Sequence, residues 1–213
     1  MAVPVLVPFS DLYDQVLPYL PGAETPLVDA QIRKALREFM RRTTINREIF
    51  EWDTAAAQAP TYHLIPSNGE VSSIIGVWLL ENDQYRQLPP VPEERRVIRE
   101  PGRPEGWYTT ALDYLTIHPA PNGVYSLRAE GVVTLLQTST HFPDYILRHH
   151  AEAICAGVLA LMYGMPGKPW TQQQAAAQAG RIFAGEIRTL RGSLRDGGQP
   201  NQSTFIAARK FGA

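Results

Sequence analysis

The sequence has very little cysteine and no long apolar run, and both shortages restrict what the protein can be. Cys155 is the only cysteine among 213 residues, so an internal disulfide framework and a zinc site made of cysteines alone are excluded. This composition favours a reducing compartment. No apolar stretch approaches the ~18 residues of a membrane-spanning helix. The start, MAVPVLVPF, lacks the basic and long apolar regions of a signal peptide, so we expect neither a membrane span nor a secretory signal.

The chain also lacks an excess of charge of either sign. Its 20 basic and 21 acidic residues give a net charge of −1, so there is no global positive field to attract nucleic acid. The charges are nevertheless segregated, because residues 1–32 contain acids and no base, whereas residues 33–47 contain six bases and one acid. Such a dipole is compatible with head-to-tail contacts between subunits or with a solvated helix face. The acids are Asp11, Asp14, Glu24 and Asp29, and the bases are Arg33, Lys34, Arg37, Arg41, Arg42 and Arg47.

Motifs of familiar enzymes are missing as well. The sequence contains no G-x-x-x-x-G-K-[ST], G-x-G-x-x-G, G-x-S-x-G or H-E-x-x-H. His149, His150 and Glu152 form one cluster of candidate metal ligands, because His149 and Glu152 have the i, i+3 spacing of carboxylate-bridged sites. Such a site needs further ligands from another helix, and the last predicted helix supplies only Glu186. We therefore expect no metal and no cofactor. Cys155 lies on an Ala- and Ile-rich face, which favours core packing over a role as nucleophile.

The stretch around which the chain is organised lies at residues 26–42. Its apolar residues recur along one face of an α-helix, and they are Val28, Ile32, Ala35, Leu36, Phe39 and Met40. Pro26 suits the first turn of this helix, and the arginines near its end oppose the helix dipole. Further helices are expected from Ser10 as an N-cap, from Asp144 and from Trp170. One helix cannot bury its apolar stripe alone, so the later helices must fold back onto it.

Residues 47–140 change to the period of β-strands, and we expect about six short strands there. Residues 47–53 and 62–65 would pair, residues 71–80 would form the most buried strand, and PAPNG at 119–123 would close a hairpin. Residues 89–106 contain five prolines together with Glu and Arg. Because proline cannot occupy a central strand, we expect an exposed excursion at this position.

Two features of the C-terminal region point to partners. Arg181, Arg188 and Arg195 recur every seven residues on the last predicted helix, with Arg191 alongside. This stripe is either a solvated face or a candidate contact with a neighbouring subunit or with DNA phosphates. After Gly198 there is no long periodicity, yet three large apolar residues and two bases lie close together, and they are Phe205, Ile206, Arg209, Lys210 and Phe211. Large apolar side chains on a chain end favour an arm that binds a partner.

The sequence resembles bacteriophage head-to-tail adaptors, also called connectors or head-completion proteins. The resemblance rests on FSDLYDQVLPYLPG at residues 9–22, on PLVDAQIRKALREFMRRT at residues 26–43, and on the order of the expected elements. It implies a ring, usually dodecameric, that lies beneath the portal and continues the DNA channel toward the tail. It also implies that the helices form the ring body, that there are no catalytic residues, and that the arm residues listed above grip the portal.

The resulting prediction is an α+β fold with an antiparallel helical bundle of two N-terminal and two long C-terminal helices. The bundle would carry an inserted antiparallel β region and an extended C-terminal arm. Residues 1–195 would form a single adaptor domain, with the bundle at 9–46 plus 143–195 and the β insertion at 47–140, followed by the arm at 196–213.

We therefore expect a non-enzymatic structural subunit of a virion neck, made in the host cytoplasm. It would form a homo-oligomeric ring that joins the portal to a tail or nozzle protein and lets genomic DNA pass without sequence-specific binding. One alternative is an intracellular enzyme or metal-binding protein that uses His149, His150 and Glu152. A second alternative, a DNA-binding regulator that uses the bases at residues 33–47, is disfavoured by the near-neutral net charge.

Overall fold

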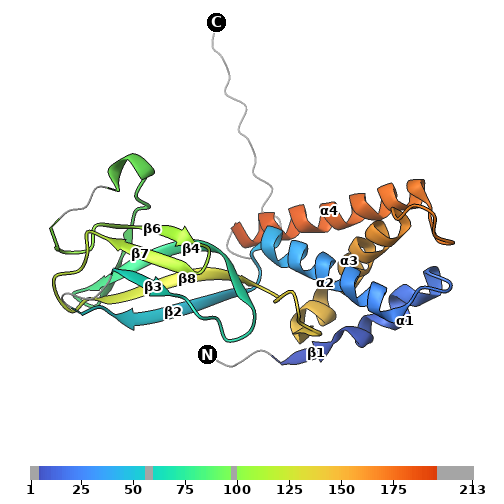
Figure 1. Cartoon of the computed structure of the whole chain (residues 1–213), viewed down its shortest axis with the longest axis horizontal. Coiled ribbons are helices and arrows are strands. Elements are labelled where there is room, and N and C mark those ends of the chain that lie inside the picture. Colours follow the sequence, from blue (N-terminus) through green and yellow to red (C-terminus); the bar gives the residue numbers. More distant parts are fainter. Residues whose placement is uncertain (1–4, 56–59, 97–99, 196–213) are drawn as a thin grey trace, which may run out of the picture.

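The computed structural model describes residues 5–55, 60–96 and 100–195 of the chain, and these form two halves that lie side by side along the long axis (Figure 1). The helical half contains β1 (Leu6–Pro8), η1 (Phe9–Leu12), α1 (Tyr13–Val16), η2 (Leu17–Tyr19), α2 (Thr25–Thr43), β9 (His141–Pro143), α3 (Asp144–Tyr163) and α4 (Gln173–Arg195). The sheet half contains β2 (Arg47–Asp53), β3 (Thr61–His63), β4 (Glu70–Glu81), β5 (Gln84–Leu88), η3 (Glu93–Arg95), β6 (Gly106–Ala111), β7 (Tyr114–His118) and β8 (Ser126–Thr134).

The predicted fold class, a helical bundle that carries a β insertion, is wrong. The structure is 41% helix and 31% strand, with four helices and three antiparallel sheets in a mostly sandwich-like arrangement. The helix expected from Ser10 is a single α turn between two 3-10 turns, and no side chain caps it. Pro18 contributes to this outcome, because its nitrogen carries no N–H that could continue the hydrogen bonds of an α-helix. The strands also bury a hydrophobic core of their own, so they are a second structural half and not an appendage of a bundle.

The helical half is built on α2, at the stretch that the apolar period predicted. Pro26 lies in the first turn of α2, and Thr44 ends the helix in the left-handed conformation, with φ 57 and its N–H bonded to the Met40 carbonyl. The apolar stripe of α2 is fully buried, and α2 packs mainly against α3, with further contacts to α4 and β8. Gly157 of α3 lets α4 approach closely, because a Cβ at this position would lie 2.9 Å from the ring of Phe183.

The strand partners differ from those expected. One sheet has the order β2-β8-β4-β5 and another the order β3-β7-β6, so residues 47–53 pair with β8 and residues 61–63 pair with β7. PAPNG at 119–123 does not close a hairpin but carries the chain from β7 in one sheet to β8 in the other. The alternation of apolar and polar side chains identifies a strand. Which strands pair depends instead on which apolar faces meet in the core.

The most buried strand is β8 and not β4. Most residues of β8 are buried, because β8 lies between β2 and β4. β4 has two register shifts along its pairing with β8 and leaves Ile75 exposed. The hairpin of β4 and β5 does follow the expected turn at Asn82 and Asp83, which both have the positive φ that such a tight turn requires.

Two adjacent crossings of the chain join the halves, and we call this region the neck. The Asn46 carbonyl, between α2 and β2, accepts a bond from the Val133 N–H near the end of β8, and the Asn46 side-chain amide donates to the Val133 carbonyl, each at 2.9 Å. Arg37 of α2 spans the same junction, donating to the Leu135 carbonyl and to Glu70 of β4, each at 2.6 Å. The neck is therefore held by lateral hydrogen bonds as well as by the covalent chain.

Candidate interaction surfaces

The candidate metal ligands do not converge on one site. The rings of His149 and His150 have centroids 6.3 Å apart, but His150 packs against Phe39 at 5.3 Å, whereas Glu152 is exposed. Burial lowers the pKa of His150, His149 lowers it further, and Glu186 opposes the shift. In the described ranges, no group of three or more potential ligands could hold a metal ion. The metal-binding alternative therefore lacks the geometry that it requires.

Cys155 is a core residue, as its Ala- and Ile-rich surroundings predicted. Its side chain is buried in the helical core, and its thiol donates to Oε1 of Gln15 in α1 at 3.4 Å. Burial, with a smaller contribution from Glu152, raises the pKa of the Cys155 thiol to about 11. At neutral pH the thiol is therefore protonated, which makes it a poor nucleophile.

The exposed face of α4 carries two of the arginines that the sequence singled out. Arg181 and Arg188 are exposed, and within the described ranges neither forms an ion pair, although Arg188 donates to the Ala184 carbonyl of its own helix at 3.3 Å. Gly185 and Gly192 alternate with these arginines at i, i+4, i+7 and i+11, so all four positions lie on one face. We call this set the Arg-Gly face.

The glycines of the Arg-Gly face are not required by the packing of the subunit. A Cβ at Gly185 or Gly192 would meet nothing within 4 Å, yet a glycine inside a helix costs about 1 kcal/mol relative to alanine. Sequence reasoning overlooked both residues, although their seven-residue spacing matches that of the arginines. Arg191 is exposed to one side of the face, and Arg195 belongs to α4 but its side chain lies outside the described part.

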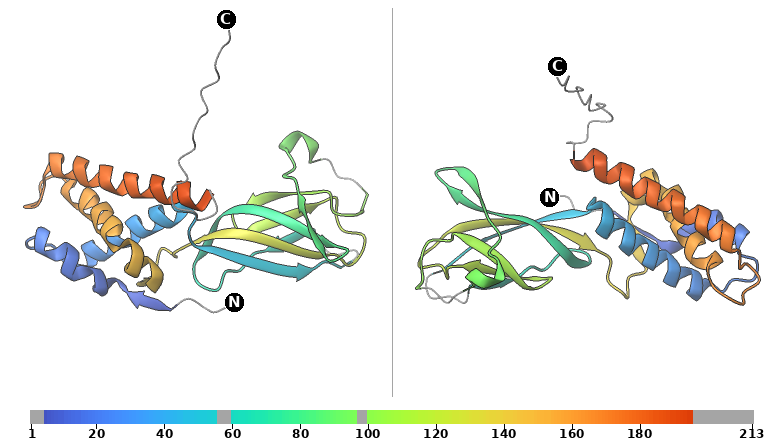
Figure 2. Two further views of the ribbon diagram at one scale, coloured as in Figure 1. Left: turned by 180° about the vertical axis from the view of Figure 1, so that it is seen from behind. Right: turned by 90° about the horizontal axis from the view of Figure 1, so that it is seen from above.

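An acidic surface lies on the opposite side of the helical half. In Figures 1 and 2, α4 runs along one side, β1 and α1 lie along the other, and α2 and α3 lie between them. Asp11 in η1 and Asp14 in α1 are exposed, and so is Glu152 on α3, a helix that contacts both η1 and α1. Arg148 shares that face of α3, but it is paired with Asp144 at 2.8 Å. We call Asp11, Asp14 and Glu152 the acidic surface.

Four basic residues of α2 line a groove of about 650 Å³ between this helix and the sheet half, and they are Arg33, Lys34, Arg37 and Arg41. Arg37 is already bonded across the neck, and Arg33 donates to the Ser139 carbonyl at 2.7 Å. Lys34 and Arg41 are exposed, and the part of the chain that the structure describes offers them no bonded partner. The segregation of charge along the sequence is therefore also a segregation in space, with α1 on one side of α2 and this groove on another.

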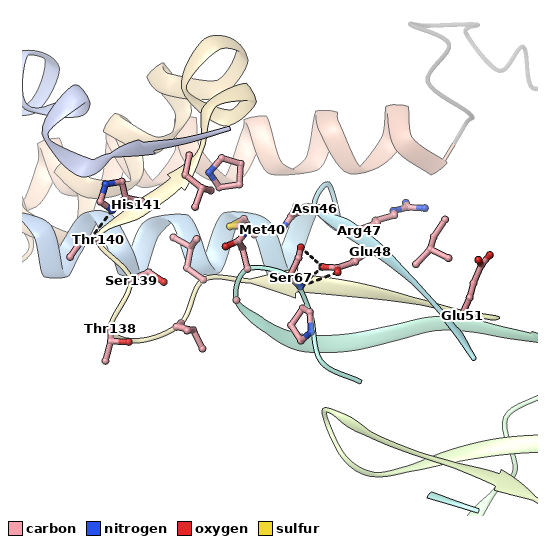
Figure 3. A pocket seen from close by; sticks show the side chains of 18 residues that line it. Met40, Asn46, Arg47, Glu48, Glu51, Ser67, Thr138, Ser139, Thr140 and His141 are labelled. Atoms are coloured by element: carbon pink, nitrogen blue, oxygen red, sulfur yellow. Dashed lines mark hydrogen bonds between the residues drawn. The ribbon is translucent and has the colours of Figure 1, made fainter. Parts of the chain in front are cut away.

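A second cavity, of about 760 Å³, lies at the neck (Figure 3). Its walls come from the end of α2, the start of β2 and residues 66–69 and 135–143. The carboxylate of Glu48 accepts bonds from the Ser67 backbone N–H at 2.9 and 3.1 Å and from the Ser67 hydroxyl at 3.2 Å. Thr140 and His141 are bonded to each other at 2.9 Å. Each of these bonds joins residues on one side of the neck, which indicates a structural role.

The proline-rich excursion at residues 89–106 is exposed in its middle and attached at its ends. Residues 92–96 are exposed, and the Val91 N–H donates to the Trp107 carbonyl at 2.7 Å. Glu81 at the end of β4 is paired with both Arg103 and Arg86. The predicted exposure is confirmed for residues 92–96, whereas Pro104 and Gly106 are buried. Residues 97–99 lie outside the described part.

The whole predicted arm at 196–213, including Phe205, Ile206, Arg209, Lys210 and Phe211, also lies outside the described residues.

Comparison with models of protein families gives a match that extends over nearly the whole chain. The model of a family described as SU10 adaptor protein matches residues 7–204. None of the curated proteins matches the chain. Across the described segments, every helix is too short or too polar to cross a membrane.

Proposed function

Because the chain belongs to the SU10 adaptor protein family, a family of phage adaptor proteins, we propose that it is the ring-forming subunit of a phage neck. Family membership makes it a structural adaptor of the virion that interacts with other head and tail proteins. The finer proposal is a ring that joins the portal to a tail or nozzle protein and continues the channel for the genome. The observation that carries it is the match over residues 7–204, which includes all the described helices and every strand except the first residue of β1.

Two sets of residues receive roles in this proposal. Arg181, Arg188, Arg191 and Arg195 are candidate contacts with a neighbouring subunit or with passing DNA. The arm residues Phe205, Ile206, Arg209, Lys210 and Phe211 would attach the ring to the portal, because burying large apolar side chains stabilises a complex by about 25 cal/mol per Å².

Electron microscopy of the purified full-length protein, alone and mixed with its portal protein, tests the proposal. We expect closed rings with a central hole, either free or stacked end-on beneath the portal ring, and portal alone serves as the control. Single subunits in both samples, with no added density on the portal, would contradict the proposed function.

A further inference from the structure

A ring assembled head to tail needs two different surfaces on each subunit, because every copy contacts one neighbour with one surface and the next neighbour with the other. The two surfaces must be complementary, and they must face away from each other. The Arg-Gly face and the acidic surface meet both conditions, since they carry opposite charges and lie on opposite sides of the helical half (Figures 1 and 2).

We propose that the Arg-Gly face of one subunit binds the acidic surface of a second copy of this chain. This inference rests on the proposed ring and assigns its subunit contact. Arg181 and Arg188 would lie against Asp11, Asp14 and Glu152 of the neighbouring copy.

The charges near each surface leave the two patches complementary. On α4, Glu186 is the exposed acid closest in sequence to the arginines, but it acts on His150 at the side where α4 meets α3. Near the acidic surface, Arg148 is occupied by Asp144. Each patch therefore presents unpaired charge of one sign, and such complementarity selects the partner and its orientation.

The glycines explain how the two surfaces could come close. Gly185 and Gly192 lie between the arginines, and each leaves open space where a Cβ would be. A neighbour could approach the α4 backbone at these points while the arginines reach past it on either side. Packing within the subunit gives no reason for either glycine, whereas contact between copies gives a reason for both.

A second copy fits these surfaces better than nucleic acid does. DNA phosphates would satisfy the arginines but would leave the acidic surface without a partner. A second copy accounts for the arginines, the glycines and the acids together, and it agrees with the net charge of −1 for the whole chain.

Charge reversal on each surface separately tests the proposal. The variant R181E/R188E makes both surfaces acidic, and the variant D11R/D14R turns the acidic surface basic. Neither variant alone should self-associate at concentrations where the wild type assembles, since like charges then face each other; we expect association at least about a hundredfold weaker. An equal mixture of the two should assemble again, because each variant offers the surface that the other needs.

Sedimentation velocity and electron microscopy measure assembly, and circular dichroism confirms that each variant is folded. K34E/R41E is the matched control, since it reverses two exposed bases of the α2 groove and should assemble as the wild type does. Gly185→Leu should weaken assembly without reversing any charge.

Several outcomes would overturn the inference. Assembly of R181E/R188E as strong as that of the wild type would do so, and a loss of DNA retention without a loss of assembly would assign the Arg-Gly face to nucleic acid instead. Folded variants that stay monomeric when mixed would also exclude this pairing. A wild type that forms no ring alone or on portal overturns the proposed function itself, which distinguishes the two failures.

Discussion

Phe39 is the residue on which the three long helices converge. Its side chain is 0% exposed, and its ring lies 5.3 Å from that of His150 on α3 and 6.2 Å from that of Phe183 on α4. The position of Phe39 in the apolar stripe of α2 was sufficient to predict its burial. The same period could not predict that His150 interrupts α3 with φ −136, because that local distortion depends on tertiary packing.

We expect Phe39→Asp to unfold the subunit. The change removes an aromatic side chain from the core and places an unpaired carboxylate there, at a cost of roughly 3 kcal/mol or more. Thermal and urea denaturation measure this, with Phe39→Leu as the control that keeps the site apolar and should be much milder. A soluble Asp variant with the wild-type melting temperature would show that the α2 stripe is not the core.

At the scale of elements, the sequence predicts helices better than strand partners. Pro26 and the residues near Thr44 mark both ends of α2, since start and stop signals are local. β2 pairs with β8, about 80 residues further along the chain, and no local signal specifies a partner at that distance. The sequence predicted only part of the Arg-Gly face. The arginines are recognisable from their charge, whereas the importance of the glycines follows only from the open space beside them in the structure.

The excursion at residues 89–106 should be the first place that trypsin cuts the free subunit. Arg95 and Arg96 are exposed around the short η3 turn, and proteases cleave exposed connecting segments before helices and sheets. Limited proteolysis followed by mass spectrometry would identify the first cut, and R95Q/R96Q should delay it. A first cut within α2 or β8, with this excursion intact, would contradict the expectation.

At the scale of the whole molecule, we expect the fold not to depend on the predicted arm. Both hydrophobic cores are made of described residues between Phe9 and Ile187. The change of period at residue 47 separated helical from β residues in the sequence, but it could not predict that the strands bury a core of their own, because membership of one core or the other is decided by contacts distant in sequence. The C-terminal residues were distinguished from the rest of the chain by their composition alone.

Deleting residues 199–213 should therefore leave the melting temperature nearly unchanged while abolishing co-sedimentation with portal rings. The expected loss follows from removing the apolar residues that the proposal assigns to portal binding. F205S/F211S in the full-length chain is the matched variant and should show the same defect. If the truncated protein bound portal as well as the intact one, the attachment would have to lie in the helical half.

The neck has a mechanical consequence. The chain crosses between the halves as two neighbouring segments, tied by the bonds between Asn46 and Val133 and braced by Arg37. Hydrogen bonds between antiparallel segments run perpendicular to the chain direction, so a pull along the neck strains them in shear and all at once. A single flexible linker would let the sheet half move without displacing the helical half. We therefore expect the neck to transmit a displacement of the sheet half to α2, so that the two halves move together under force.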